Sequence, residues 1–259
     1  MTFKRKKTIR LAVDIGNTAI SLGLLENGRV AWVRSVETAA RPAVFLGKIK
    51  TILSSLTRRY PSLEEVVICS VVPAAFAVIQ NLIRKEFSLK TIVVGRDKIV
   101  PIKNHYRNPA QVGQDRLICA YAARELYGTP LIVIDFGTAI TYDVVSKKGE
   151  YLGGIIVPGI RLTAESLFKK TALLPKVRIR TPRELIGRDT NNSILSGIFY
   201  GYGSLSKGLI DLIGKEIKSK PKVIITGGYS HWVKKYISYP ATIDPHLVFK
   251  GMSLVLSSD

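Results

Sequence analysis

Cysteine is scarce in this chain, which has two among 259 residues, Cys69 and Cys119. They lie fifty positions apart in apolar surroundings, and neither has a Cys or His neighbour at metal-ligand spacing. The pattern predicts two buried, reduced thiols. Reduced thiols are typical of the cytoplasm, which is the compartment that we expect.

Long apolar runs are also missing. No stretch approaches the roughly 18 residues that a membrane-spanning helix needs. The basic start, Met1 to Arg10, leads into an apolar run that Asp14 interrupts at once. We therefore expect neither a signal peptide nor a membrane partner.

Acidic residues are few, with 19 Asp and Glu against 39 Lys and Arg, which gives a formal net charge of +20. This surplus favours anionic partners such as nucleotides, nucleic acid or acidic lipid headgroups, and the charge alone does not choose among them. The remaining composition, 46% hydrophobic and 22% charged, is that of an ordinary folded protein. The length suits one large domain or two smaller ones.

One pattern of secondary structure occurs twice. A strand-like run over 8–13 ends at Asp14-Ile15-Gly16-Asn17-Thr18, and a similar run over 131–134 ends at Asp135, 121 residues after Asp14. Strand and helix patterns alternate elsewhere, so we predict an α/β protein of two related halves, 1–118 and 119–259, with a cleft between them. Further strands are expected over 19–25, 29–36, 66–72, 91–94, 140–145, 151–157 and 222–226, helices over 41–60, 74–87, 117–126, 163–173 and 192–218, and a helix or strand over 251–256.

The two acidic turns have the residue types that phosphate binding needs. Asp14 and Asp135 each follow a buried run, and each is followed by a glycine and a threonine. The carboxylate can hold Mg²⁺ directly or through water, while backbone N–H groups and the Thr hydroxyl reach phosphate oxygens. A single Asp-x-Gly turn is weak evidence, because such a turn is often purely structural and binds no ligand. Two facing turns would hold a polyphosphate from both sides, so the pair predicts phosphate binding.

A third glycine-containing segment follows the strand expected over 222–226. There Gly227-Gly228 offers bare backbone against which an adenine or ribose would lie, and a turn without any ligand is the alternative. The chain has no Gly-x-x-x-x-Gly-Lys-Ser/Thr, which excludes a P-loop. It also lacks a kinase-type glycine loop and a Gly-x-Ser-x-Gly elbow.

A proton acceptor is the remaining requirement of phosphoryl transfer to an alcohol. The segment Gly113-Gln114-Asp115-Arg116 supplies a carboxylate beside a guanidinium that can hold an acidic substrate through paired hydrogen bonds. The alternative is that Asp115 only caps the following helix.

Taken together, these motifs resemble type III pantothenate kinase, over almost the whole chain. The matching segments are Asp14-Ile15-Gly16-Asn17-Thr18, Gly113-x-Asp115-Arg116, Asp135-x-Gly137-Thr138, Tyr151-Leu152-Gly153-Gly154, Pro158-Gly159-Ile160 and Gly227-Gly228. That family belongs to the actin, sugar-kinase and heat-shock-protein superfamily, whose halves are two related ribonuclease-H-like domains. The resemblance implies a cytoplasmic homodimer that uses ATP to phosphorylate pantothenate, the first step of coenzyme A synthesis.

The resemblance also implies roles for individual residues. Asp115 would accept the proton, Asp14 would lie near the Mg²⁺ of Mg-ATP, and Asp135 would bind a monovalent cation, K⁺ or NH₄⁺. Thr138 would contact ATP, and Thr190 would reach substrate near the dimer interface. The first phosphate loop would be Asp14, Ile15, Gly16, Asn17, Thr18, Ala19, Ile20 and Ser21, and the pantothenate site would include Tyr106, Gly113, Gln114 and Arg116.

Two other functions fit parts of the sequence. A catalytically silent kinase-fold regulator would bind nucleic acid through basic clusters at Lys4 to Lys7 and over 169–188. A regulator freed from catalysis has no need for the three aspartates, so nucleic acid is the disfavoured partner. A ribonuclease-H-type nuclease needs several carboxylates on adjacent strands, and only Asp14 qualifies.

A dimer interface is suggested by the helix expected over 192–218. Its apolar residues recur at spacings of three, four and seven, with glycines between them that permit close helix approach. The same stripe would serve equally in the core of one chain. Its members are Ile194, Ile198, Leu205, Leu209 and Leu212, with Gly197, Gly201 and Gly208.

Overall fold

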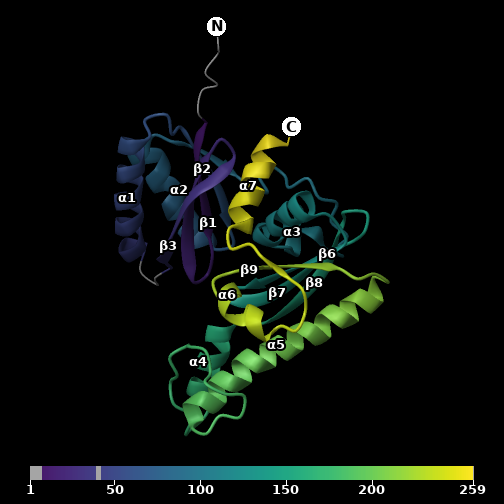
Figure 1. Cartoon of the computed structure of the whole chain (residues 1–259). Coiled ribbons are helices and arrows are strands. Elements are labelled where there is room, and N and C mark those ends of the chain that lie inside the picture. Colours follow the sequence, from purple (N-terminus) through teal and green to yellow (C-terminus); the bar gives the residue numbers. More distant parts are fainter. Residues whose placement is uncertain (1–7, 39–41, 259) are drawn as a thin grey trace. The chain divides into compact units, whose positions relative to one another are not determined.

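The computed structural model describes residues 8–38 and 42–258 (Figure 1). The basic cluster at Lys4 to Lys7 therefore lies outside the described residues. Contacts group the chain into two compact units, the first formed by Met1–Ile102, Ala110–Ala122 and His246–Asp259, the second by Lys103–Pro109 and Ala123–Pro245. The predicted boundary at residue 118 separates the half with the first phosphate loop from the half with the second. It stays a prediction.

The first unit is built on a five-stranded sheet of order β3-β2-β1-β4-β5. The strands are β1 (Ile9–Ile15), β2 (Ala19–Glu26), β3 (Arg29–Glu37), β4 (Glu65–Ser70) and β5 (Lys90–Val93). β1 pairs antiparallel with β2 and parallel with β4, so it lies at the centre of the sheet. The β2–β3 hairpin turns at Asn27-Gly28, both with positive φ, as the Asn-Gly pair requires.

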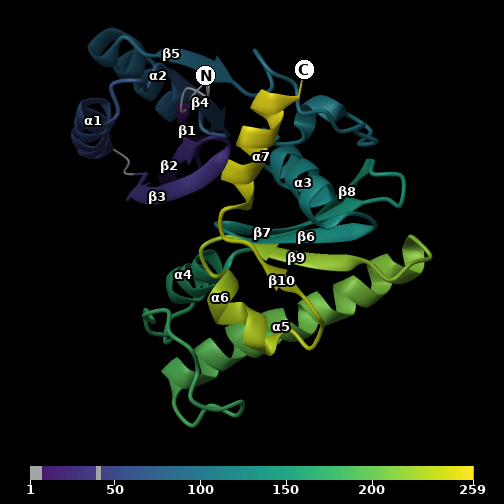
Figure 2. The same ribbon diagram turned by 45° about the horizontal axis from the view of Figure 1, so that its top comes forward.

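Helices cover both faces of this sheet. α1 (Pro42–Arg59) and α2 (Pro73–Phe87) pack on one face, while α7 (Leu247–Ser257) contacts β1, β2 and β3 on the other (Figure 2). Alternation along β1 explains the layers, because Leu11, Val13 and Ile15 join the core with α1 and α2. Asp14 has the opposite parity and therefore faces the other layer. This unit also contains the beginning of α3 (Gln114–Tyr127) and part of the short helix η1 (Pro109–Gln111).

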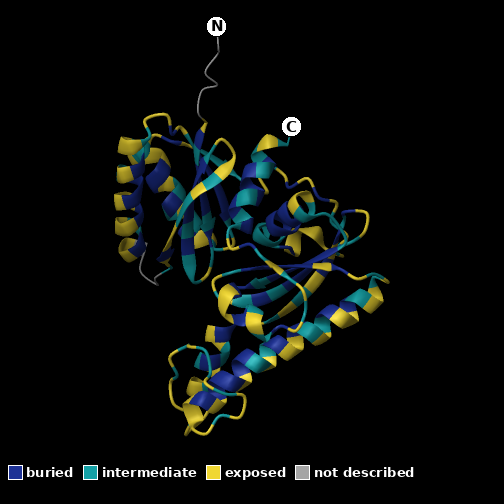
Figure 3. Cartoon of the chain, viewed as in Figure 1, coloured by how far each residue is buried: buried dark blue, intermediate teal, exposed yellow. Residues whose placement is uncertain are grey.

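The second unit repeats the same strand order, β8-β7-β6-β9-β10. Its strands are β6 (Leu131–Phe136), β7 (Ala139–Val145), β8 (Tyr151–Pro158), β9 (Lys222–Thr226) and β10 (Thr242–Ile243), and its helices are α4 (Ile160–Lys170), α5 (Thr190–Glu216), α6 (Ser230–Val233) and η2 (Lys234–Tyr236). One core joins the sheet to α4, α5 and α6. Figure 3 shows its effect on α5, which is buried along one side and exposed along the other.

The predicted elements are all present, with differences at their ends. Residues 251–256 belong to a helix, α7, and the short elements β10 and α6 were not predicted. α4 begins at Ile160 rather than at residue 163, and it ends at Lys170, where the Thr171 hydroxyl donates to the Leu167 carbonyl at 2.7 Å. Both cysteines are buried and neither is in a disulfide, as predicted.

None of the helices in the described part of the chain has the length and apolar character to cross a bilayer.

Candidate functional site

The first acidic turn connects β1 to β2. Asp14 pairs with Ser21 across the hairpin, and the Gly16 N–H donates to the Ala19 carbonyl at 2.9 Å. Thr38, just beyond β3, is hydrogen-bonded to this turn. Its hydroxyl donates to the Gly16 carbonyl at 2.9 Å, and its N–H donates to the Thr18 carbonyl at 2.8 Å. The sequence analysis missed Thr38, because a single hydroxyl after a strand gives no distinctive signal.

The members of this turn divide into anchors and accessible residues. Ile15 and Ile20 are fully buried in the core beneath it, so their side chains fix the turn and only their backbone is near its surface. Asn17 is exposed, while Gly16 and Thr18 are half-buried. The remaining two predicted members, Ala19 and Ser21, lie on β2, where the Ser21 hydroxyl hydrogen-bonds that of Ser35 at 2.8 Å.

Asp14 and Asp115 come together around Cys69. Cys69 on β4 is the direct neighbour of Asp14 across the parallel pair of strands. Burial raises the pKa of the Cys69 thiol well above its usual range, and the negative charges of Asp14 and Asp115 raise it further. Both carboxylates therefore act on one buried thiol. Val71, directly after β4, connects the two turns, because its N–H donates to the Ile15 carbonyl at 3.1 Å and its side chain lies against Gly113.

The turn before α3 fixes the orientation of Asp115. Asp115 lies in the first helical turn, where its Oδ1 accepts a hydrogen bond from the backbone N–H of Arg116 at 2.9 Å. A Cβ on Gly113 would collide with that oxygen, so a larger residue there would displace the Asp115 carboxylate. Gln114 lies against Gly95 of the loop after β5, and Arg116 is half-buried.

The second acidic turn lies in the other unit and likewise joins a central strand, β6, to its antiparallel neighbour, β7, with one residue fewer between the paired positions. Asp135 pairs with Thr141 on β7 and with Thr226 on β9. Thr138 is exposed at the tip, and its carbonyl accepts the Gly159 N–H at 3.1 Å. Gly227 lies directly against the Asp135 carboxylate and the Phe136 backbone, where a Cβ would collide with both.

The glycine pair after β9 differs in its two members. Gly227 has φ +90°, which favours glycine, and it is packed closely. Gly228 is exposed, and a Cβ there would meet no atom within 4 Å. The Tyr229 N–H donates to the Phe136 carbonyl at 3.2 Å, which ties the end of the pair to the second acidic turn. Gly228 thus presents bare backbone to open space.

Tyr106 belongs to the second unit, in the segment Lys103–Pro109. Two backbone bonds of 2.9 Å attach this segment to Tyr151 on β8, and the Tyr106 ring lies against Gly153. Tyr151 in turn donates to Asp143 Oδ1 at 2.8 Å. Asp143 is buried and also accepts the Thr141 hydroxyl at 2.9 Å. The sequence analysis missed this support, although a carboxylate within the apolar run over 140–145 was an available signal.

Thr190 is the first residue of α5, where Asp189 caps the helix by accepting the Asn192 N–H at 2.8 Å. That hydrogen bond holds the pKa of Asp189 below its usual range. Thr190 lines a hollow of about 410 Å³ between α4 and α5. The other residues that line it are mainly apolar or small: Thr163, Leu167, Leu174, Ser193, Ile194, Gly197, Ile198, Gly201, Tyr202 and Leu205.

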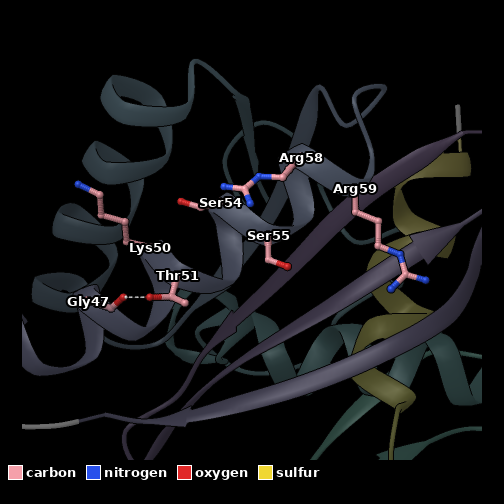
Figure 4. A pocket seen from close by; sticks show the side chains of 7 residues that line it. All are labelled: Gly47, Lys50, Thr51, Ser54, Ser55, Arg58 and Arg59. Atoms are coloured by element: carbon pink, nitrogen blue, oxygen red, sulfur yellow. Dashed lines mark hydrogen bonds between the residues drawn. The ribbon is translucent and has the colours of Figure 1, made fainter.

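A larger hollow, of about 660 Å³, runs along α1 and includes none of the predicted residues. Figure 4 shows its lining of hydroxyl and basic side chains, with the Thr51 hydroxyl directed back to the Gly47 carbonyl. Lys50 on its margin forms an ion pair with Glu86 of α2. The lining therefore belongs to the solvated face of α1, and it contributes nothing to the acidic turns.

No group of three or more His, Cys, Asp or Glu side chains within residues 8–38 and 42–258 is arranged to hold a metal ion. Single carboxylates at Asp14 and Asp135 suit ions whose other ligands are oxygens of a phosphate, water or the backbone.

Comparison with known sequences points to one family. The family model described as type III pantothenate kinase matches residues 10–212. A protein of Persephonella marina described as type III pantothenate kinase is 41% identical over 244 residues, which cover 93% of this chain and 96% of that protein.

Comparison with solved structures shows the fold. Ethanolamine utilization protein EutJ of Carboxydothermus hydrogenoformans matches with a TM-score of 0.54 at 14% identity, covering 97% of this chain and 90% of that one. Component A of (R)-2-hydroxyglutaryl-CoA dehydratase from Acidaminococcus fermentans gives 0.54 at 14% identity, covering 96% and 97%. A Streptomyces griseus ROK family glucokinase gives 0.50 at 12% identity, covering 96% and 99%. The predicted α/β fold of two related, actin-like halves is confirmed.

Proposed function

Because this chain belongs to the type III pantothenate kinase family, it is a pantothenate kinase, and we propose that Asp115 accepts the proton of the pantothenate hydroxyl during transfer of the ATP γ-phosphoryl group. The observation that supports the proposal is the contact of Val71 with both turns: its N–H donates to the Ile15 carbonyl next to Asp14, and its side chain lies against Gly113 in the turn that holds Asp115. Transfer is direct, with no covalent enzyme intermediate.

The residues around Asp115 hold the alcohol for attack. Arg116 binds the carboxylate end of pantothenate or a neighbouring oxygen, and Gly113 and Gln114 line the same site. Tyr106, whose ring lies against Gly153, is the remaining proposed member of the pantothenate site. Positioning of the hydroxyl and stabilisation of charge supply most of the rate enhancement, as in other phosphoryl transfers.

The two acidic turns act on the nucleotide. Backbone N–H groups of the first loop and the Thr138 hydroxyl bind phosphate oxygens, and Gly227-Gly228 flank the adenosine. Asp14 would hold Mg²⁺ through the Mg-ATP substrate, and Asp135 would hold K⁺ or NH₄⁺. These cations offset the negative charge that develops on the transferring group.

One assay tests this function by omission. Purified protein with ATP, Mg²⁺, K⁺ and pantothenate is expected to release ADP, and leaving out any one component is expected to lower the rate at least about tenfold. Activity that is independent of pantothenate would contradict the proposal. A DNA-binding titration run in parallel tests the silent regulator, which requires tight binding that persists at physiological salt.

We propose that nucleic acid is not a partner and that the enzyme is cytoplasmic. Several basic side chains form ion pairs within the chain, as in Arg10–Glu65 at 2.8 Å, Lys103–Glu150 at 2.9 Å and Arg161–Glu165 at 2.9 Å. Two buried cysteines without a disulfide suit a reducing compartment.

A homodimer through α5 is the proposed assembly, with Thr190 reaching substrate near the interface. The apolar stripe predicted on this helix divides in two. Ile194 and Ile198 are buried in the core of the unit, whereas Leu205 and Leu212 are 38% and 61% exposed. Three glycines share the exposed side, and a Cβ on any of them would meet no atom within 4 Å: Gly197, Gly201 and Gly208. Such a surface allows close helix approach.

The double substitution Leu205→Glu and Leu212→Glu is expected to give a monomer, because it places four charges in the proposed interface of a dimer. Light scattering should then report a mass near 28.6 kDa, the mass of one chain, against twice that value for the unaltered protein. Leu126→Glu, at an exposed leucine of α3, serves as the matched control and should leave the dimer intact. An unaltered protein of one-chain mass would refute the dimer.

A further inference from the structure

An exposed tryptophan stands one helical turn beyond the glycine pair. Trp232 of α6 is 41% exposed, and its backbone N–H donates to the carbonyl of Tyr229 at 3.0 Å. Tyr229 follows Gly228 directly, and Gly228 presents bare backbone to open space. A large, flat side chain with free surface therefore lies close in the chain to the backbone that we assign to adenosine.

Aromatic neighbours hold this tryptophan. The Phe199 ring, fully buried on α5, lies nearly parallel to the indole, at 24° with ring centroids 6.4 Å apart. Tyr229 meets it almost perpendicularly, at 81° and 6.1 Å. Because Phe199 is behind the indole in the core, the exposed surface of Trp232 lies on the side away from Phe199. The ring is thus held in place by packing while part of it is open to solvent.

We propose that Trp232 is the stacking platform for the adenine ring of ATP. The inference rests on the proposed function, and it adds a residue that determines nucleotide affinity. Adenine has an apolar, polarisable face, and stacking on an aromatic ring is among the stronger contacts that a base makes with protein. A ring already held by Phe199 and Tyr229 loses little conformational entropy when the base binds.

Kinetics of matched variants test the proposal. Trp232→Ala is expected to raise the KM for ATP about tenfold, with kcat at saturating ATP and the KM for pantothenate unchanged. Trp232→Phe keeps a flat ring and should restore most of the affinity for ATP. A merely structural role for the indole would not predict a loss that is confined to the KM for ATP and recovered by phenylalanine. Phe168→Ala, at an aromatic residue of α4 that is 43% exposed, is the matched control and should leave the KM for ATP unchanged.

Intrinsic fluorescence gives a second, independent measurement. The chain has two tryptophans, Trp32 and Trp232, so Trp32→Phe leaves the α6 indole as the sole emitter of this type. ADP should quench that emission in a saturable way, and it should not quench the emission of Trp232→Phe, where Trp32 on β3 remains.

The outcomes separate this inference from the function on which it rests. If the unaltered protein forms no ADP in response to pantothenate, the proposed function is wrong. If it is active but Trp232→Ala has an unchanged KM for ATP, or ADP leaves the emission of Trp32→Phe unaltered, adenine does not stack on Trp232.

Discussion

Replacing Asp115 with Asn is expected to lower kcat by about a hundredfold or more, because an amide cannot take the proton of the attacking hydroxyl. The change keeps the size of the side chain and its Oδ1, which accepts the Arg116 N–H at 2.9 Å, so the turn before α3 should keep its shape. ATP binding, measured by the rise in unfolding temperature that the nucleotide causes, should be nearly unchanged. A steady-state assay of ADP release at saturating substrates measures the effect.

The matched control for this variant is Asp211→Asn. Asp211 is an exposed carboxylate of α5 that pairs with Lys207 one turn earlier, and it lies outside both acidic turns. We expect kcat to stay within about twofold of the unaltered enzyme, since a surface ion pair of this kind contributes little. Near-normal turnover by the Asp115 variant would show that another group accepts the proton.

The second large effect is expected at Gly227. Alanine there must adopt φ +90°, and its Cβ would collide with the Asp135 carboxylate and with the Phe136 backbone. Backbone strain and overpacking together should lower the free energy of unfolding by about 3 kcal/mol. Displacement of Asp135 should also lower kcat about a hundredfold, because small misplacements of catalytic groups are costly. Denaturant unfolding and the kinase assay measure the two effects.

The adjacent Gly228→Ala variant provides the comparison. Its Cβ has no atom within 4 Å, so the free energy of unfolding should change by no more than about 0.5 kcal/mol. The added methyl group would nonetheless intrude where we place the adenosine, and the KM for ATP should rise. Equal stability of the two variants would mean that Gly227 is not held as tightly as its surroundings indicate.

The sequence predicted the repeated architecture because its signals are local. The apolar runs that end at Asp14 and Asp135, and the Asn27-Gly28 hairpin, each depend on neighbouring residues, and the two sheets indeed share one strand order. The family resemblance then supplied the candidate site residues. Their placement in the structure is compatible with the roles proposed for Asp14 and Asp115, which stay predictions.

Other features could not be predicted because they depend on tertiary contacts. β10 consists of Thr242 and Ile243, too short for any periodicity, and exists because those residues pair with β9. The α5 stripe mixes core and surface positions, and only the position of the second sheet decides that Ile198 is buried while Leu212 is exposed. Likewise, no sequence signal joins the turn of Asp14 to that of Asp115, because the link is a tertiary contact of Val71 with both.

The C-terminal helix has a consequence for how the chain is completed during translation. α7 packs on the first sheet, with Phe249 against Gly23 of β2 and the Ser253 hydroxyl donating to the Gly28 carbonyl at 2.9 Å. Residues 246–258 are synthesised after the whole second unit. The first unit therefore emerges early from the ribosome but receives its covering helix only after the second unit has been synthesised, and until then one face of its sheet is exposed to solvent.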